Sequence, residues 1–309
     1  MIPDETLRER LCSLSAKLRQ AVIGQDEAVA TIVPRLQHAA LALTMPGRPK
    51  ASFLFLGPTG VGKTKLVLQF TQELLGPGKV VRLDMSEYKT EDRLTLLLGS
   101  SRDDPGRIAE GYDACDGIGT LLLDEIEKAH PRILDILLQL LEPARLTTGA
   151  NRVLDFSSWY VAMTSNIGAQ RIMAMRKSLY ETMRRLVERD AQSELRPEIF
   201  ARITEAVVLN KLSYDVLCRI ADAVLVEELA HHRACGHAVT YERGVVDVVI
   251  KQGYNDRLGA RPMRDAVERL VRNALTDDLL NSGRGAGRLR AHPSGTKLEL
   301  LPTAMAAAA

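Results

Sequence analysis

The sequence has little that would set it apart from ordinary globular proteins. Aromatic residues make up only 4% of its 309 residues, so a mostly aliphatic core is expected. The 41 Lys and Arg nearly balance the 39 Asp and Glu, which leaves no broad basic surface for nucleic acid. No stretch has the roughly 18 unbroken apolar residues of a membrane-spanning helix. The charged start MIPDETLRER has no apolar core of a signal peptide. These absences predict a cytoplasmic protein with no membrane partner, and disfavour a nucleic-acid partner.

Cysteine is also scarce, with four residues and no paired spacing, which predicts reduced thiols rather than a disulfide framework. One local group, His231, His232, Cys235 and His237, contains two residues four apart that would share a helix face, as metal ligands can. We favour the other interpretation, the solvated end of a helix stopped at Gly236. No second ligand pair follows at zinc-finger spacing.

Short apolar runs alternate with helical patterns over the first two thirds of the chain. Strands are predicted in SFLFLG, VVRLDM, GTLLLDE, SSWYVAMTSN and ITEAVVL. Such alternation predicts an α/β fold with a five-stranded parallel sheet flanked by helices. After this region a long helix over 214–235 begins a mainly helical part, in which SGRGAGR (282–288) is expected as a flexible turn. The predicted domains are residues 1–209, large and α/β, and 210–309, small and mainly helical.

A phosphate-binding loop is predicted at GPTGVGKT, which fits G-x-x-x-x-G-K-[ST] in full. It follows a predicted strand and opens a predicted helix, the context that supports this motif. Backbone N–H groups of such a loop close around phosphate oxygens, and the helix N-terminus adds positive potential. We expect Lys63 to reach the β and γ phosphates of ATP and Thr64 to hold Mg²⁺. The predicted cofactor-binding residues are Gly57, Pro58, Thr59, Gly60, Val61, Gly62, Lys63 and Thr64.

Two carboxylates, Asp124 and Glu125, end the predicted strand TLLLDE. Side chains at the carboxyl end of a buried strand face the ligand crevice of an open α/β sheet. Asp124 is expected to support the Mg²⁺ shell, and Glu125 to orient and deprotonate the attacking water. Alone, the pair would equally suit the N-cap of the next helix. The phosphate loop beside it favours the catalytic role.

Several motifs in order resemble the Clp family, and most of all the second ATPase module of ClpB-type AAA+ unfoldases. The resemblance extends from about Val22 to Leu301, and a generic phosphate-loop protein would not share its last four segments. The segments that carry it are VIGQDEAV, GPTGVGKT, LLLDEIEKAHP, RLTTGANRVLDF, MTSNIG, RPEIFARITEAVVL and GYNDRLGARPMRDAV.

The resemblance implies roles for five further residues. Val22 and Ile23 match the turn that contacts adenine, and Asn166 matches the first polar sensor of the γ-phosphate. Arg202 matches the arginine finger that reaches a neighbouring subunit's nucleotide, and Arg261 matches the second sensor on the smaller domain. The plainer alternatives are a turn-forming Asn, a surface ion pair and a helix-start arginine. A finger acting on a neighbour implies a ring, and the family's ring is a hexamer.

The sequence departs from the family in four respects, three of which are brief. Lys65 follows the phosphate loop where the family has an acid. Nothing between Asn166 and Arg196 resembles the tripeptide loop that docks a Clp protease, so a protease partner is not expected. The sequence also contains no counterpart of the family's substrate-docking domain or first ATPase module.

The largest departure is GSSRDDPGRIAEGY, residues 99–112, where the family has a loop with an aromatic grip that lines the central pore. Aligning on the Pro-Gly pair places Arg107, Ile108 and Ala109 at the grip, and aligning on the first glycine places Asp104 there. Neither alignment supplies an aromatic residue. We expect a projecting loop that selects a specific partner by charge, or else a solvated connector.

Three functions follow from these observations. The first is an ATP-hydrolysing, Mg²⁺-dependent Clp-type ring that remodels or unfolds protein substrates. The second is a regulatory or scaffolding AAA+ ring that acts on a dedicated protein partner without threading it. The third, a nucleic-acid-associated AAA+ ATPase, is disfavoured by the balanced charge.

Overall fold

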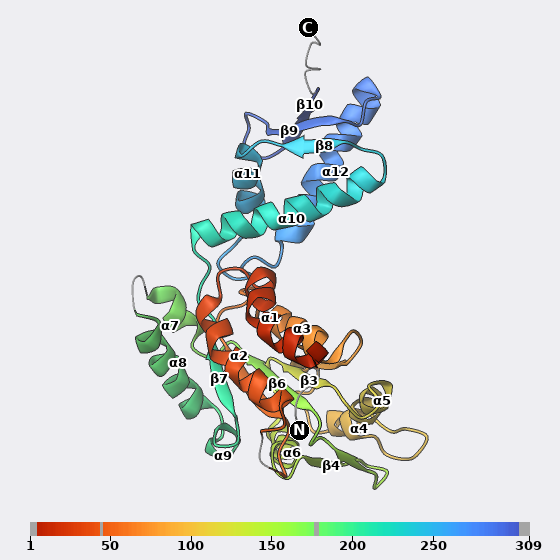
Figure 1. Ribbon diagram of the computed structural model, residues 1–309, viewed down its shortest axis with the longest axis vertical. Coiled ribbons are helices and arrows are strands. Elements are labelled where there is room, and N and C mark those ends of the chain that lie inside the picture. Colours follow the sequence, from red (N-terminus) through yellow and green to blue (C-terminus); the bar gives the residue numbers. More distant parts are fainter. Residues whose placement is uncertain (1–4, 44–45, 176–178, 303–309) are drawn as a thin grey trace. The chain divides into compact units, whose positions relative to one another are not determined.

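The computed structural model describes residues 5–43, 46–175 and 179–302. It divides into two compact units, the first ending at Lys211 and the second beginning at Leu212. Residues Thr59–Val61 are grouped with the second unit. Figure 1 labels the elements of both.

The first unit alternates strands with helices along the chain. Its elements in order are α1 (Glu5–Ala21), α2 (Asp26–Ala40), β1 (Ala51–Leu56), α3 (Lys63–Leu75), β2 (Val80–Asp84), η1 (Met85–Glu87), α4 (Arg93–Leu98), α5 (Arg107–Ala114), β3 (Thr120–Asp124), η2 (Ile126–Lys128), α6 (Pro131–Leu141), β4 (Arg145–Thr147), β5 (Val153–Asp155), β6 (Tyr160–Ser165), α7 (Ala169–Ala174), α8 (Tyr180–Glu194), α9 (Pro197–Phe200) and β7 (Glu205–Val208).

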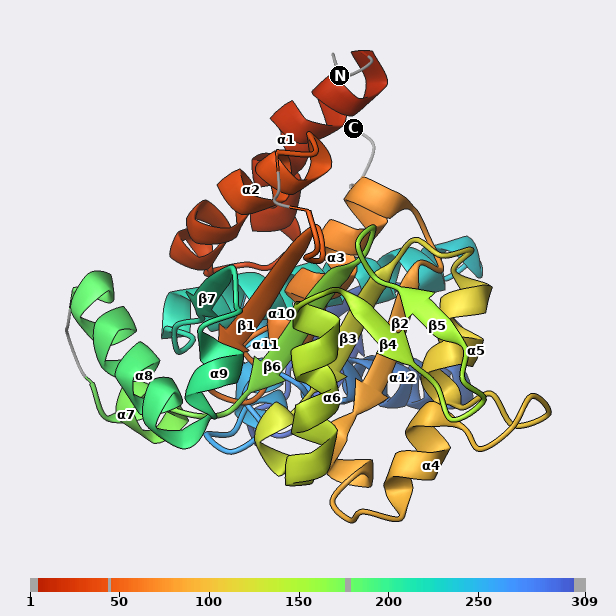
Figure 2. The same ribbon diagram turned by 90° about the horizontal axis from the view of Figure 1, so that it is seen from below.

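Five parallel strands form the main sheet in the order β2-β3-β6-β1-β7, which confirms the predicted fold class. Strands β1 and β6 are buried along their whole length because helices cover both faces of the sheet. Successive side chains point to opposite faces. Phe53 therefore meets the ring of Phe70 on α3, with centroids 6.0 Å apart, whereas Leu54 joins the core cluster that contains Ile133 of α6. Figure 2 shows α6 lying across the sheet.

The second unit is mainly helical, as predicted. It contains α10 (Tyr214–Ala234), β8 (Val239–Tyr241), α11 (Gly244–Gly253), α12 (Met263–Ser282), β9 (Gly287–Ala291) and β10 (Leu298–Leu301). The expectation of a flexible turn over 282–288 is wrong at its end, because β9 begins at Gly287 and pairs with β8 and β10. The basic run hid a strand in which Leu289 is buried between the exposed Arg288 and Arg290.

The structure also bears on the possible metal ligands near His231 and on membrane-spanning helices. No cluster of metal-ligating side chains occurs among the described residues, and His232 instead pairs with Glu228 at 3.1 Å. No helix in the described part of the chain combines the length and apolar character needed to cross a bilayer.

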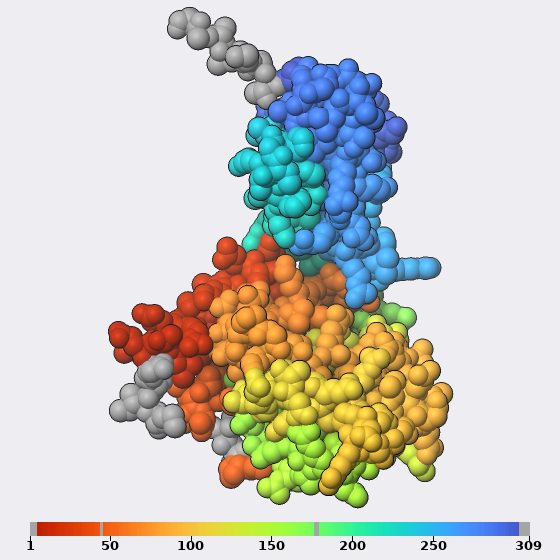
Figure 3. Space-filling view, turned by 90° about the vertical axis from the view of Figure 1, so that its right-hand side faces the viewer, coloured from red at the N-terminus to blue at the C-terminus, as the bar shows by residue number. Residues whose placement is uncertain are grey.

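Residues 99–112 form a short closed loop followed by a helix. The backbone amides of Ser100 and Ser101 donate to the Asp104 carbonyl at 3.0 and 3.3 Å, and the Ser100 hydroxyl donates to the Asp104 carboxylate at 2.8 Å. Because α5 begins at Arg107, the expectation of a loop over the whole segment is wrong for its second half. The α4–α5 loop projects from the first unit (Figure 2), and the gold part of the chain lies on the face turned to the viewer in Figure 3.

The only aromatic residue of this segment, Tyr112, is used for packing. Its ring stacks on Trp159 with centroids 5.3 Å apart and planes 14° from parallel, and it meets Phe156 edge-on at 5.4 Å. Its hydroxyl donates to the Asp155 carbonyl at 3.1 Å. Tyr112 therefore fastens α5 to the end of β5 and the connection between β5 and β6.

Candidate nucleotide-binding site

The predicted site residues of the first unit gather at one edge of its sheet. Strands β3, β6 and β1 are neighbours and run parallel, so their carboxyl ends meet at the same edge. Leu56 ends β1 and leads into the phosphate loop, Asp124 ends β3, and Asn166 directly follows β6. Ligands of open α/β sheets bind outside this edge.

The phosphate loop requires glycine at two tightly packed positions. Gly57 and Gly62 have φ values of 146° and 109°, which L side chains rarely adopt. A Cβ on Gly57 would lie 2.7 Å from the Leu209 carbonyl oxygen, and one on Gly62 would lie 2.8 Å from Cγ1 of Val22. The bare backbone of the loop is the kind of cradle that phosphate groups need.

Lys63 is buried and folds back onto the loop that precedes it. Its Nζ donates to the carbonyl oxygens of Gly57 at 2.5 Å and Pro58 at 2.9 Å, and to Oδ1 of Asn166 at 2.9 Å. The ammonium is therefore held by uncharged carbonyl and amide oxygens at the mouth of the loop. Phosphate oxygens would be stronger acceptors for it.

Asp124 is 5% exposed and surrounded by donors. Its Oδ1 accepts from the hydroxyls of Thr64 at 3.1 Å and Thr164 at 2.9 Å, and its Oδ2 pairs with Nε of Arg82 at 2.6 Å. A hydroxyl and a carboxylate at one point form the hard oxygen set that Mg²⁺ prefers. The side chains present therefore fit Mg²⁺ completed by phosphate oxygens and water.

Glu125 adopts a strained conformation beside this pair, with φ 57° and ψ 50°. Its backbone N–H donates to the Thr164 hydroxyl at 3.1 Å, and its carboxylate forms an ion pair with Lys128. The hydrogen bond that Lys128 donates to the Glu125 carboxylate holds the pKa of Lys128 above its usual value. In this conformation the carboxylate of Glu125 is engaged by Lys128, and a role as base would require it to leave that pair.

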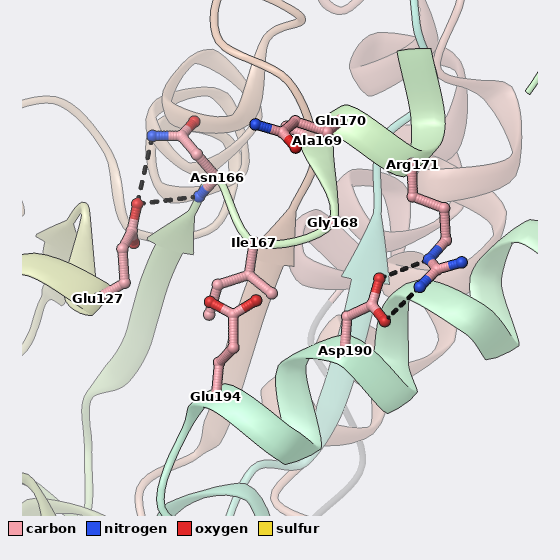
Figure 4. Close-up of a pocket in the computed structure, with 9 residues that line it drawn as sticks. All are labelled: Glu127, Asn166, Ile167, Gly168, Ala169, Gln170, Arg171, Asp190 and Glu194. Atoms are coloured by element: carbon pink, nitrogen blue, oxygen red, sulfur yellow. Dashed lines mark hydrogen bonds and ion pairs between the residues drawn. The ribbon is translucent and has the colours of Figure 1, made fainter. Parts of the chain in front are cut away.

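Asn166 is oriented by Glu127 (Figure 4). Oε1 of Glu127 accepts from the backbone N–H of Asn166 at 3.2 Å and from its side-chain amide at 3.3 Å, which leaves Oδ1 facing Lys63. Both residues line a hollow of about 440 Å³ with residues 167–171, Asp190 and Glu194.

The turn between α1 and α2 carries Val22 and Ile23. Val22 is buried against Gly62, as the spacing above shows, and Ile23 is partly exposed. Gln25 fixes the turn, because its amide donates to the Asn210 carbonyl at 3.0 Å and accepts from the Asn210 N–H at 2.9 Å. The turn thus lies beside the phosphate loop.

Of the two predicted arginines, only Arg202 belongs to the same unit as this group, and it lies apart from it. Arg202 is at the opposite edge of the sheet, where its carbonyl accepts from the hydroxyl of Ser52 near the start of β1 at 3.0 Å. Its guanidinium pairs with Glu142 at 3.3 Å and donates to the Glu198 carbonyl at 2.9 Å. Arg261 belongs to the second unit, exposed and just before α12.

Sequence reasoning missed the residues that hold the predicted ones in place: Thr164, Arg82, Glu127 and Lys128. Thr164 stands two positions before Asn166 on β6, and Arg82 stands two positions before the end of the neighbouring strand β2. Their positions near the carboxyl ends of predicted strands could have marked Thr164 and Arg82 as neighbours of the site. The pairings of Glu127 and Lys128 depend on the strained turn after β3, which no local pattern reveals.

The fold and the site define a phosphate-loop ATPase domain followed by a smaller helical unit. Residues 48–206 match the family model described as AAA domain (Cdc48 subfamily), and residues 212–288 match the C-terminal, D2-small domain of ClpB protein. The chain belongs to the AAA family, and within it to the Clp ATPases of ClpB type, which confirms the resemblance seen in the sequence.

Similar curated proteins include heat shock protein 100 of Trypanosoma brucei brucei, 37% identical over 86% of this chain and 32% of that protein. Chaperone protein ClpB of Meiothermus ruber is 35% identical over 97% of this chain and 36% of that protein. Hsp104 solved with ATPγS and FITC casein in a closed state matches at TM-score 0.84 and 29% identity, over 97% of this chain and 53% of that one. The Saccharomyces cerevisiae Hsp104–ADP complex matches at 30% identity with the same TM-score. The chain spans about a third of the length of the curated relatives.

The Thr164 hydroxyl holds both carboxylate-bearing residues of the site, and this generates a prediction. Thr164→Val leaves the N–H of Glu125 without its acceptor and removes one donor from Asp124, so ATP turnover should fall about 10–100-fold. The free energy of unfolding should fall by about 1–3 kcal/mol. Thr164→Ser keeps the hydroxyl and serves as the control in the same phosphate-release assay and urea titration. Equal turnover in the Val and Ser variants would contradict this role.

Proposed function

We propose that this protein hydrolyses ATP in a Mg²⁺-dependent reaction and uses it, as a Clp-type ring, to remodel protein partners. The observation that carries the proposal is the meeting of Lys63, Thr64, Asp124 and Asn166 within hydrogen-bond distance at one edge of the sheet. On this proposal the large α/β domain, residues 1–209, binds nucleotide, and residues 210–309 form its lid. A cytoplasmic location is part of the same proposal.

The site residues divide the chemistry among them. Lys63 exchanges the Gly57 and Pro58 carbonyls for the β and γ phosphates, and Thr64 with Asp124 holds Mg²⁺, which neutralises charge on those phosphates. Glu125 leaves Lys128 and takes a proton from the attacking water. Asn166 turns its amide toward that water or the γ-phosphate.

The remaining residues bind the nucleotide. The backbone of residues 57–62 cradles the phosphates, Val22 and Ile23 contact adenine, and Arg261 senses nucleotide from the lid.

The position of Arg202 supports a role on a neighbouring copy. Its backbone is anchored at Ser52, whereas the phosphate loop begins at Gly57, and five residues of strand separate these points by about 17 Å. An arginine side chain does not span that distance. An arginine that stabilises the transferred phosphoryl group must then serve the next subunit, and head-to-tail contacts of this kind close into rings. We propose a hexamer, by likeness to the family.

The α4–α5 loop favours a second candidate, a ring that acts on a dedicated partner without threading it. Ile108 and Ala109, two residues at the expected grip, are buried in the core. The loop closes on Asp104 and is braced from the β4–β5 hairpin, where the N–H of Gly149 donates to the Leu98 carbonyl at 3.0 Å. Its exposed tip presents Ser101, Arg102 and Asp103. A braced, charged tip suits one complementary surface better than arbitrary unfolded chains. Neither candidate includes a protease or nucleic-acid partner.

The ATPase assignment is tested at Glu125. Glu125→Gln keeps the shape of the side chain and removes the base, so nucleotide should bind while turnover falls at least 100-fold. Lys63→Ala should instead weaken ATP binding itself. Fluorescent-nucleotide titration and phosphate release separate the two effects. Glu73→Gln is the control, because Glu73 of α3 forms an ion pair with Lys17 of α1, away from the phosphate loop. Undiminished turnover in Glu125→Gln would refute the assignment.

The two candidates differ in their response to unfolded protein. If the tip is a selective contact, an unfolded protein such as casein should not raise the ATPase rate of the wild type. Arg102→Tyr adds an aromatic side chain of large contact area at the tip, and should raise the response, whereas Arg102→Lys should not. Stimulation of the wild type equal to that of Arg102→Tyr would support general threading and exclude the selective tip.

A further inference from the structure

A second cavity, unrelated to the phosphate loop of the same copy, lies at the amino ends of β1 and β7. It measures about 210 Å³. Basic side chains dominate its wall, and no acidic side chain is among the described residues that line it. The basic lining residues are Arg35, His38, Arg48, Lys50 and Arg202.

The charges around this cavity do not balance. Arg48 and Arg202 share the single carboxylate of Glu142, at 3.5 and 3.3 Å, and Arg35 pairs with Glu205 at 2.9 Å. Lys50 adds another positive charge that no carboxylate of the described chain offsets. Positive charge thus exceeds negative charge around a hollow large enough for a small ion.

Lys50 is the most exceptional of these groups. It is half-buried, and among the described residues its ammonium makes no ion pair and no hydrogen bond. Its Nζ lies over the ring face of Tyr160, 5.8 Å from the centroid. Burial lowers the pKa of Lys50, which shows that the charged form is held there at a cost. An oxyanion would offset that cost by supplying a charged acceptor.

Strand direction separates this cavity from the copy's own nucleotide. Ala51 and Ser52 line the cavity and begin β1, whereas the phosphate loop follows Leu56 at the other end of the strand. Any phosphate bound beside Lys50 therefore comes from solution or from another copy.

We propose that this cavity binds a phosphate-class oxyanion, with Lys50 and Arg48 as direct ligands beside Arg202. The anion is either free phosphate or the terminal phosphate of a nucleotide held by the next copy. The second source rests on the proposed function. It would make Lys50 a second cation that one subunit contributes to its neighbour's site.

The first arm of the test measures phosphate binding without the phosphate loop. In a Lys63→Ala background, isothermal titration with inorganic phosphate and with tripolyphosphate should detect the cavity alone. Lys50→Met should weaken the binding of both about tenfold, since it removes one charge-assisted contact. Lys50→Arg keeps the charge and should retain binding. Lys251→Met, at an exposed lysine of α11, is the matched control.

The second arm identifies the source of the phosphate. Lys50→Met copies are mixed with Lys63→Ala copies, so that mixed assemblies pair a competent nucleotide site with an intact cavity. ATP turnover above the sum of the separate proteins assigns the anion to the neighbour's nucleotide. Weaker tripolyphosphate binding in Lys50→Met without this gain assigns it to free phosphate.

One result would overturn the proposal. In that result, the Lys50→Met and Lys251→Met variants have the same tripolyphosphate affinity and the same ATP turnover, and mixing Lys50→Met with Lys63→Ala copies gives no extra turnover. A wild type that fails to hydrolyse ATP would defeat the proposed function alone, because the binding arm does not depend on turnover.

Discussion

The parallel direction of β3, β6 and β1 is the constraint on which the rest of the molecule depends. Because the three strands are neighbours and point the same way, everything that follows their carboxyl ends converges at one edge. The phosphate loop, Asp124 and Asn166 meet there although more than a hundred residues separate the first from the last. The same direction places Arg202 and Lys50 at the other edge, beside the start of β1. The sheet thus gives each copy two chemically different edges, one that collects phosphate-binding groups and one that is strongly basic.

At the first edge, the side chains of the candidate site are all bound to other groups of the protein. Lys63 is bound to loop carbonyls, Glu125 to Lys128, and the amide of Asn166 to Glu127. In the proposed roles, each of these groups would exchange a protein partner for phosphate or water. The exchanges are linked, because Lys63 and Glu127 hold opposite ends of the Asn166 amide. Binding of phosphate by Lys63 would release Oδ1 of Asn166 and so free its side chain to turn.

Elements that have a clear local pattern in the sequence could be predicted from it. The buried strands appear as short apolar runs, and the phosphate loop as a fixed spacing between a strand and a helix, so the sheet and the residues at its carboxyl edge could be predicted. The β4–β5 hairpin and α8 were not, because three-residue strands give little signal and α8 is strongly polar, with only a narrow apolar stripe of Met183, Val187 and Ala191. The basic run around Arg288 concealed β9, whose buried Leu289 shows only in alternation.

The candidate site was predicted less completely than the fold. Thr64, Asp124 and Asn166 were expected, but the pairings of Glu125 with Lys128 and of Asn166 with Glu127 arise from a strained turn that spacing does not describe. The role of Tyr112 depends on Trp159, which lies 47 positions further along the chain and meets it only through the fold. Contacts of that range are set by packing, and a motif carries no information about them.

We propose that hydrolysis needs two copies, because the proposed base Glu125 and the proposed finger Arg202 lie at opposite edges of the sheet. The most direct test is the ATPase rate per chain as the protein is diluted through the concentration at which assemblies dissociate, with their size followed by light scattering. If two copies are needed, the rate per chain falls together with the assemblies, while nucleotide binding to the single chain persists. A rate per chain that stays constant after the assemblies have dissociated would contradict it.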